Sequence, residues 1–180
     1  MRLRGRRLTM VLAIVLVVIL GGGASAAWAL GKTRATPMPL GYSAGPSADQ
    51  TVRLSSSANQ YPRADDVRQT LQGYFEAINR RDFDAWATVV APDQSASQTA
   101  DEWIHKYSTT IDSNLMVVDI QDDPLRARLM FTSEQDSEFA PKRLPVDCIN
   151  WDLTYLLTDR DGTLVLSGID PSAQAMTACR

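Results

Sequence analysis

The sequence predicts an α+β fold in which helices come first and an antiparallel sheet follows. Between residues 65 and 111, apolar side chains recur every three or four positions, as on the buried face of a helix. From residue 115 onward the period changes to two, as in strands with one buried face. Because short turns separate these segments, we expect three helices packed on a sheet of about four strands.

A sharp turn at Arg81 and Asp82 joins the first two predicted helices. Helical spacing predicts the first helix over residues 65–80, and the second runs from Asp82 to the residue before Pro92. The carboxylate of Asp82 is suited to accept hydrogen bonds from free backbone N–H groups at the start of the second helix. The residue before a proline disfavours helical conformation, so the second helix ends there.

A capping box from Thr99 to Glu102 predicts the third helix, which continues to about residue 111 after a polar loop at residues 93–98. Alternating apolar residues then predict strands at residues 115–120, 125–132, 146–158 and 163–169. Asp161 and Gly162 form a turn signal of the kind that joins two antiparallel strands. The helices therefore precede a meander of strands.

The N-terminal segment, residues 1–31, is a signal or membrane-anchor segment. Four arginines lie within the first seven residues, and no charge follows until residue 32. One interpretation is a secretory signal that is cleaved at small residues near residues 24–29. The other, which we favour, is a single-pass anchor over residues 8–30, because that stretch is long enough to span a bilayer. Both interpretations place the rest of the chain outside the cytoplasm.

Residues 32–62 contain four prolines and many small polar residues without helical or alternating periodicity, so they are predicted to form a flexible linker. Residues 63–180 then form one domain of ordinary size. Four of the 18 basic residues lie before residue 8, which leaves 14 basic against 21 acidic residues in the rest of the chain. An acidic domain of this kind repels nucleic acid, so we expect no nucleic-acid partner.

The chain lacks the motifs of metal, redox and nucleotide sites. Its one histidine, His105, has no companion ligand, and we interpret it as a partly exposed helix residue. There is no HExxH, no CxxC and no glycine-rich loop before a helix, so we expect no metal and no cofactor. The two cysteines, Cys148 and Cys179, are interpreted as a disulfide in an extracytoplasmic domain; two separate thiols are the alternative.

Residues 74–86, with the sequence YFEAINRRDFDAW, resemble the Y-x-x-A-x-N-x-x-D-x-x-A entry into the second helix of the NTF2-like superfamily. This superfamily includes ketosteroid isomerases, scytalone dehydratase and SnoaL-type cyclases. The resemblance extends over residues 65–169 and implies a cone in which three N-terminal helices pack on a curved antiparallel sheet of about four strands. The chain also resembles the exported versions of this fold found in actinobacteria.

The resemblance to the isomerases implies a catalytic role for Tyr74, whose position matches a tyrosine that donates a hydrogen bond to a developing oxyanion. The isomerases also have a carboxylate after the second helix as general base, but residues 94–98 are neutral here. Asp152 and Asp159 are candidates for a further acid on a later strand. With only Tyr74 matching the pattern, whether the chain is an enzyme stays open, and we lean towards a non-enzyme.

We therefore expect an exported, membrane-tethered NTF2-like domain that binds a small apolar ligand or a cell-envelope protein without catalysis. The alternative is an isomerase or cyclase that uses Tyr74. The candidate pocket lining is aromatic, although the same side chains could simply fill the core: Tyr74, Trp86, Trp103, Tyr107, Phe131, Trp151 and Tyr155. The candidate surface for a homodimer or an envelope partner is the other sheet face: Arg126, Arg128, Asn150, Asp152 and Thr154.

Overall fold

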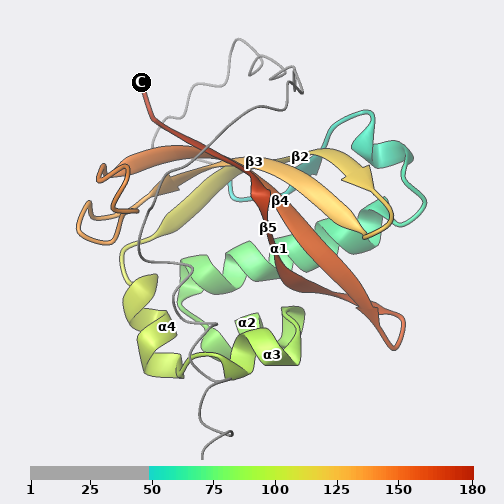
Figure 1. Cartoon of the computed structure of the whole chain (residues 1–180), viewed down its shortest axis with the longest axis horizontal. Helices are drawn as coiled ribbons and strands as arrows, with labels where there is room; N and C mark the ends of the chain where they lie inside the picture. Colours follow the sequence, from blue (N-terminus) through green and yellow to red (C-terminus); the bar gives the residue numbers. More distant parts are fainter. Residues whose placement is uncertain (1–48) are drawn as a thin grey trace, which may run out of the picture. The chain divides into compact units, whose positions relative to one another are not determined.

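Five strands form one mixed sheet, and four α-helices lie on one side of it (Figure 1). The computed structural model describes residues 49–180. The strands are β1 (Arg53–Leu54), β2 (Ile111–Gln121), β3 (Arg126–Glu134), β4 (Cys148–Arg160) and β5 (Thr163–Ala178), and they lie in this order across the sheet. The helices are η1 (Ala58–Gln60), α1 (Ala64–Arg80), α2 (Phe83–Val89), α3 (Pro92–Ala96) and α4 (Ala100–Lys106).

The predicted fold class, three N-terminal helices on about four antiparallel strands, is wrong in its elements. The described residues contain four α-helices and five strands, and β1 pairs with β2 in parallel, which makes the sheet mixed. Strand β1 has two residues and α3 has five, so both are too short to show a period in the sequence. A parallel pairing also joins residues far apart in the chain, and local spacing does not report it.

The predicted boundaries differ from the structure at three places. Residues 49–62 of the predicted linker contain β1 and η1, and Val52 is fully buried beside β1. The third predicted helix ends at Lys106 rather than near residue 111, because β2 already begins at Ile111. The last strand extends past residue 169 to Ala178, where it continues to pair with β4.

Helix α1 buries its apolar face against the inner face of the sheet, as its spacing predicts. Val67, Leu71, Phe75 and Ile78 are almost completely buried. The helix ends where Arg81 adopts the left-handed conformation, with φ of 58°. The guanidinium of Arg81 donates hydrogen bonds to backbone carbonyls in the α1 C-terminus and in the connection to β2, so the end of α1 is fixed beside the start of β2.

The predicted caps of α2 and α4 are confirmed, whereas α1 begins after Arg63 without a side-chain cap. The side chain of Asp82 accepts a hydrogen bond from the backbone N–H of Ala85 at the start of α2. Thr99 and Glu102 form the reciprocal capping box of α4. These short-range bonds set the direction in which each helix leaves its turn.

The predicted alternation of β3 is also confirmed. Ala127, Leu129 and Phe131 are buried on the inner face, whereas Arg126 and Arg128 are only partly buried on the outer face. Cys148 and Cys179 form a disulfide with Cα atoms 5.4 Å apart, which joins the start of β4 to the residue after β5. Both ends of the longest strand pair are thus connected, one by the hairpin turn and one by the disulfide.

The predicted signal or anchor segment, including the span at residues 8–30, lies outside the described residues. Within residues 49–180, no helix combines the length and the apolar character that a membrane crossing requires.

Candidate active site

A cavity of about 320 Å³ lies between α1, α4 and the inner face of the sheet. Seven aromatic side chains line it: Tyr74, Phe75, Tyr107, Phe131, Phe139, Trp151 and Tyr155. The polar side chains that line it are Lys106, Thr110, Asp112, Ser133, Gln135 and Gln174. Among the described residues of this lining, Asp112 is the one carboxylate, so an acid lies in a largely apolar space.

Asp112 is the second residue of β2 and is only 3% exposed. The hydroxyl of Ser133, its partner across the β2–β3 ladder, donates a hydrogen bond to the Asp112 carboxyl oxygen Oδ1. Burial raises the pKa of Asp112 to about 7, and the Ser133 hydrogen bond lowers it against that trend. Burial dominates because the charged form loses its hydration, so this carboxyl group exchanges a proton near neutral pH.

Asn79, in the last turn of α1, holds the backbone of Asp112. Its Nδ2 donates to the carbonyl oxygen of Asp112 at 2.9 Å, and its Oδ1 accepts from the backbone N–H of Asp112 at 2.7 Å. Both bonds are buried, so they are protected from exchange with water. The amide therefore fixes the start of β2 against α1, and with it the direction in which Asp112 leaves the strand.

Three tyrosines surround the acid. The rings of Tyr74 and Tyr155 are 5.7 Å apart in an edge-to-face arrangement, and Tyr107 lies in the same lining. Burial raises the pKa of Tyr74 and of Tyr155 well above the ordinary value, and the nearby Asp112 and Tyr107 raise both further. Both hydroxyls therefore keep their protons at neutral pH and are available as hydrogen-bond donors.

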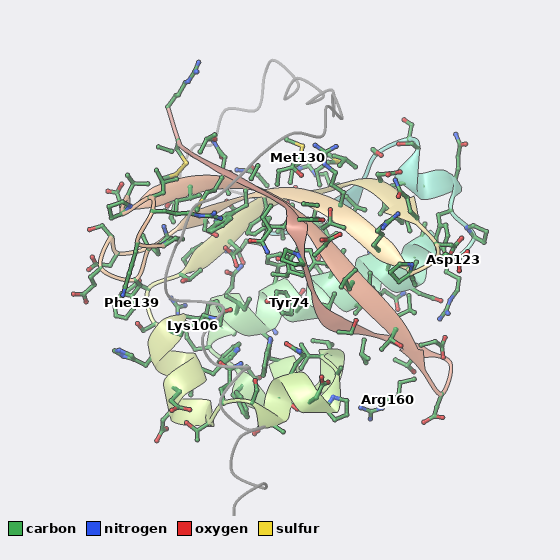
Figure 2. The ribbon with its side chains drawn as sticks, in the orientation of Figure 1. Tyr74, Lys106, Asp123, Met130, Phe139 and Arg160 are labelled. Atoms are coloured by element: carbon green, nitrogen blue, oxygen red, sulfur yellow. A yellow bond between two sulfur atoms is a disulfide. The ribbon has the colours of Figure 1, made fainter. Side chains whose placement is uncertain are left out.

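Lys106 and Phe139 lie at one end of the cavity lining, away from Tyr74, as Figure 2 shows. The exposed Lys106 places its Nζ 5.0 Å from the centre of the Tyr107 ring. Phe139 comes from the loop between β3 and β4, and its ring contacts His105 of α4 at 5.2 Å. The predicted partly exposed histidine is thus an exposed residue of α4 that packs on this loop. One end of the cavity therefore offers a positive charge next to solvent.

The structure separates the aromatic residues that the sequence grouped as a pocket. Tyr74, Tyr107, Phe131, Trp151 and Tyr155 line the cavity. Trp86 and Trp103 do not; their rings pack 5.3 Å apart in the closed core among the helices. Both groups have the same helical or alternating spacing in the sequence. Spacing identifies a buried face, but it does not tell whether that face meets a cavity or a packed neighbour.

Sequence reasoning missed Asp112, Ser133, Asn79 and Lys106 as site residues. Asp112 fell between the predicted end of the third helix and the predicted strand at residues 115–120, and nothing in its neighbourhood in the sequence indicates burial. The carboxylates that the resemblance suggested lie elsewhere: Asp152 pairs with Arg128, and Asp159 pairs with Arg63. Neither of them lines the cavity.

Residues 49–180 contain no group of three or more His, Cys, Asp or Glu side chains arranged to hold a metal ion. The fold and the cavity together define an α+β protein with a recessed site that combines an aromatic wall with a titratable acid. Over residues 67–178 the chain matches the family model described as Survival protein SurE. The match covers more than half of the chain, and the chain belongs to this family. Comparison with curated proteins and with solved structures gives no match.

The family match overturns the predicted resemblance to the NTF2-like superfamily and the functions taken from it. The motif at residues 74–86 has a local explanation: Asn79, Arg81 and Asp82 make the corner between α1 and α2. Such a corner depends on helix capping and on contact with β2, not on one family. The ligand binder without catalysis and the isomerase or cyclase are both withdrawn.

The predicted cellular location and the predicted partners of the chain also need correction. The expected membrane contact through residues 8–30 lies outside the described residues, and residues 49–180 add no candidate span. The prediction of a membrane-tethered or secreted domain rested on residues 1–31, which lie outside the described residues; the match to the SurE family model does not support it, and it is withdrawn. The same applies to the homodimer or envelope partner on the sheet face, which is largely occupied by internal pairs such as Arg128 with Asp152.

Proposed function

We propose that the chain is a phosphatase that hydrolyses a phosphate monoester, with Asp112 as the group that transfers the proton. The SurE family is a phosphatase family, and family membership is what suggests this reaction class. The observation that carries the proposal to particular residues is the buried carboxyl group of Asp112, which lines the cavity and has a pKa of about 7. A group with this pKa is both protonated often enough to donate and ionised often enough to accept at neutral pH.

The reaction requires one proton at the leaving oxygen. Water forms a new bond to phosphorus, the bond between phosphorus and the ester oxygen breaks, and the departing alkoxide takes up a proton. Protonated Asp112 donates this proton and then regains one from the attacking water, so the products are an alcohol and inorganic phosphate. Ser133, which donates a hydrogen bond to Asp112, holds the carboxyl group in one orientation during both steps.

Two regions of the cavity lining would bind the two parts of such a substrate, its organic group and its phosphate. The aromatic wall buries the organic part of the ester, as apolar walls do in small-molecule sites generally. Lys106, at the solvent-exposed end, supplies a positive charge for the phosphate group. Tyr74 and Tyr155 keep their protons and can donate hydrogen bonds to the ester as negative charge develops on it.

The test is the release of inorganic phosphate from phenyl phosphate by the full chain, measured from pH 5 to pH 9 with added Mg²⁺. Removing a general acid lowers the rate by about 10² to 10⁴ fold, so Asp112→Asn should lose at least a hundredfold in kcat. Asp119→Asn is the matched control, because Asp119 lies outside the cavity lining. In the wild type, kcat should fall as pH rises through about 7, where Asp112 loses its proton.

Absence of phosphate release from the folded wild-type chain would refute the proposal. Equal rates for Asp112→Asn and the wild type would refute the role of Asp112 even if the chain is a phosphatase.

A further inference from the structure

A second, polar pocket of about 250 Å³ lies on the outer face of the sheet, opposite the aromatic cavity. Arg126 and Arg128 line this pocket from β3, and Thr154 lines it from β4. The two arginines alternate with buried residues of the inner face and share the outer face with Met130, which Figure 2 labels. The proposed phosphatase reaction uses none of these side chains.

An irregularity in the pairing of β4 with β5 forms one side of the pocket. Only Thr154 of β4 lies between two paired positions, whereas four residues of β5, 170–173, lie between the same two positions. The extra residues make β5 bulge, and Asp170 and Ala173 at the two ends of the bulge line the pocket. Bulges re-aim side chains and are over-represented beside active sites.

The hydroxyl group of Thr154 is a polar group of this pocket that the described part of the chain does not use. Thr154 is 7% exposed, and its hydroxyl makes no hydrogen bond with another residue among residues 49–180. Its neighbours Leu153 and Tyr155 line the inner cavity, so the alternation of β4 directs Thr154 into the outer pocket. The side-chain atoms that are both unpartnered and sealed from solvent belong to other residues, so the Thr154 oxygen is accessible from the pocket.

Arg126 and Asp170 place opposite charges in the pocket, and within residues 49–180 they form no ion pair with each other. In the same part of the chain, the Arg126 side chain makes one hydrogen bond, from Nε to Oε1 of Gln121 at 3.1 Å, and both Nη atoms are unused. Asp170 accepts hydrogen bonds at Oδ1 from the backbone N–H and the hydroxyl of Ser172, at 2.9 and 2.6 Å. Hydrogen bonds from Ser172 lower the pKa of Asp170 and the charge of Arg126 lowers it further, so Asp170 is ionised at neutral pH.

The other two charged side chains of the lining interact within the protein. Arg128 donates hydrogen bonds from Nε and Nη2 to the carboxylate of Asp152. This hydrogen bonding raises the pKa of Arg128, and the negative charge of Asp119 raises it further. Among the charged groups of this lining, Arg126 and Asp170 are therefore the cation and the anion that a ligand can use.

We infer that this pocket binds the zwitterion of a free α-amino acid. The carboxylate of the amino acid accepts hydrogen bonds from the two unused Nη atoms of Arg126, in the bidentate geometry that guanidinium groups favour. Its ammonium group donates to Oδ2 of Asp170, and the Thr154 hydroxyl donates to the carboxylate. Asp170 repels a simple anion and Arg126 repels a simple cation, so a small molecule with both charges is the matching ligand.

The experiment titrates the purified full chain with three compounds that share one skeleton: L-serine, N-acetyl-L-serine and L-serinamide. N-acetyl-L-serine lacks the ammonium charge, and L-serinamide lacks the carboxylate. Binding is measured by NMR from the backbone amide resonances of Thr154 and Ala173, which lie at the pocket.

Two variants each remove one charge from the pocket. Arg126→Gln removes the cation, and Asp170→Asn removes the anion while it keeps an acceptor for Ser172. Arg143→Gln and Asp161→Asn are the matched controls, because both side chains are exposed and lie outside this lining. Circular dichroism verifies the folding of each variant.

A hydrogen bond to a charged group contributes about tenfold or more in affinity, so the wild type should bind L-serine at least that much more tightly than either analogue. Arg126→Gln should bind L-serine and L-serinamide about equally. Asp170→Asn should bind L-serine and N-acetyl-L-serine about equally, and the control variants should keep the wild-type preferences. A variant that only disturbs the fold would weaken the binding of all three compounds alike, so the changed preference reports on the paired charge.

Unchanged Thr154 and Ala173 resonances on addition of millimolar L-serine overturn the inference, and so does equal binding of the three compounds by the wild type. Preferences that survive in both pocket variants place the binding elsewhere and also overturn it. If a pocket variant does not fold, the wild-type preferences and resonances decide. None of these measurements depends on phosphate release, so failure of the phosphatase proposal and failure of this inference are distinguishable.

Discussion

An aspartate on the inner face of the central strands and an aspartate on the outer face have opposite surroundings. On the inner face, Asp112 is buried beside a hydroxyl group and aromatic rings, without an ion pair among residues 49–180, and its pKa rises to about 7. On the outer face, Asp152 lies against Arg128, whose Nε donates to the Asp152 carboxylate at 2.8 Å. Figure 2 shows the two faces through Tyr74, on the helix side, and Met130, on the opposite side of the sheet.

The comparison teaches that environment, not residue identity, decides which acid can act at neutral pH. The outer carboxylate is paired with an arginine in a partly hydrated setting. The inner carboxylate has no such partner in the part of the chain that the structure describes, and burial favours its protonated, neutral form. Reactive chemistry is therefore expected on the inner face, and structural pairing on the outer face.

The largest expected difference between the faces is in the pH dependence of stability. The folded-state pKa of Asp112 is about 7, above the unfolded value of about 3.9. The folded state therefore binds more protons between these pH values, and its free energy of unfolding falls as pH rises through that window. The loss for this one group is roughly 4 kcal/mol at pH 8. Other carboxyl groups, such as Asp159 with its lowered pKa, act in the opposite direction at lower pH.

Asp112→Asn should remove this dependence, because an amide does not titrate. Urea denaturation at pH 4.5 and pH 8 should show the variant gaining stability relative to the wild type as pH rises. Asp152→Asn on the outer face is the control and should not gain stability in this way. If the wild type and Asp112→Asn change in parallel between the two pH values, Asp112 does not have the raised pKa that distinguishes the inner face.

The next effect concerns how the inner acid is held. Asn79→Ala removes both hydrogen bonds to the backbone of Asp112 and leaves a buried N–H and a buried carbonyl without those partners. We expect a loss of about 2 to 4 kcal/mol in the free energy of unfolding, measured by urea denaturation. Asn59→Ala, at an exposed position in η1, should change stability by less than about 0.5 kcal/mol. A similar small loss for Asn79→Ala would mean that α1 does not fix the start of β2.

The sequence predicts those parts of the fold that depend on near neighbours. Asp82 caps α2 through a residue three positions away, and Thr99 and Glu102 cap α4 over the same distance. Likewise, the alternation of apolar and polar residues in β3 indicates which face of the strand is buried. In each case the contact that stabilises the element is either local in the chain or repeated at a fixed spacing, so the pattern can be recognised without the tertiary structure.

The candidate site depends instead on contacts between distant residues. Asp112 becomes a buried acid because Asn79, 33 positions earlier, and Ser133, 21 positions later, fold around it. Its own neighbourhood in the sequence has the polar character of an exposed segment. Trp86 shows the converse case, since it has the spacing of a pocket residue but packs against Trp103. Local spacing carries no information on which buried face remains unfilled.

The smallest expected effect belongs to the outer face. Arg128 and Asp152 are 37% and 22% exposed, so water and salt screen their attraction. A double-mutant cycle with Arg128→Ala and Asp152→Ala should give a coupling energy of about 1 kcal/mol or less, measured by urea denaturation. The coupling should decrease further between 0.05 M and 1 M salt, since screening becomes stronger. Phosphate release should change little in either variant, because neither side chain lines the cavity. A coupling energy well above about 2 kcal/mol that is insensitive to salt would instead show that the outer ion pair is desolvated. The outer aspartate would then differ from Asp112 only in having an arginine partner, not in its hydration.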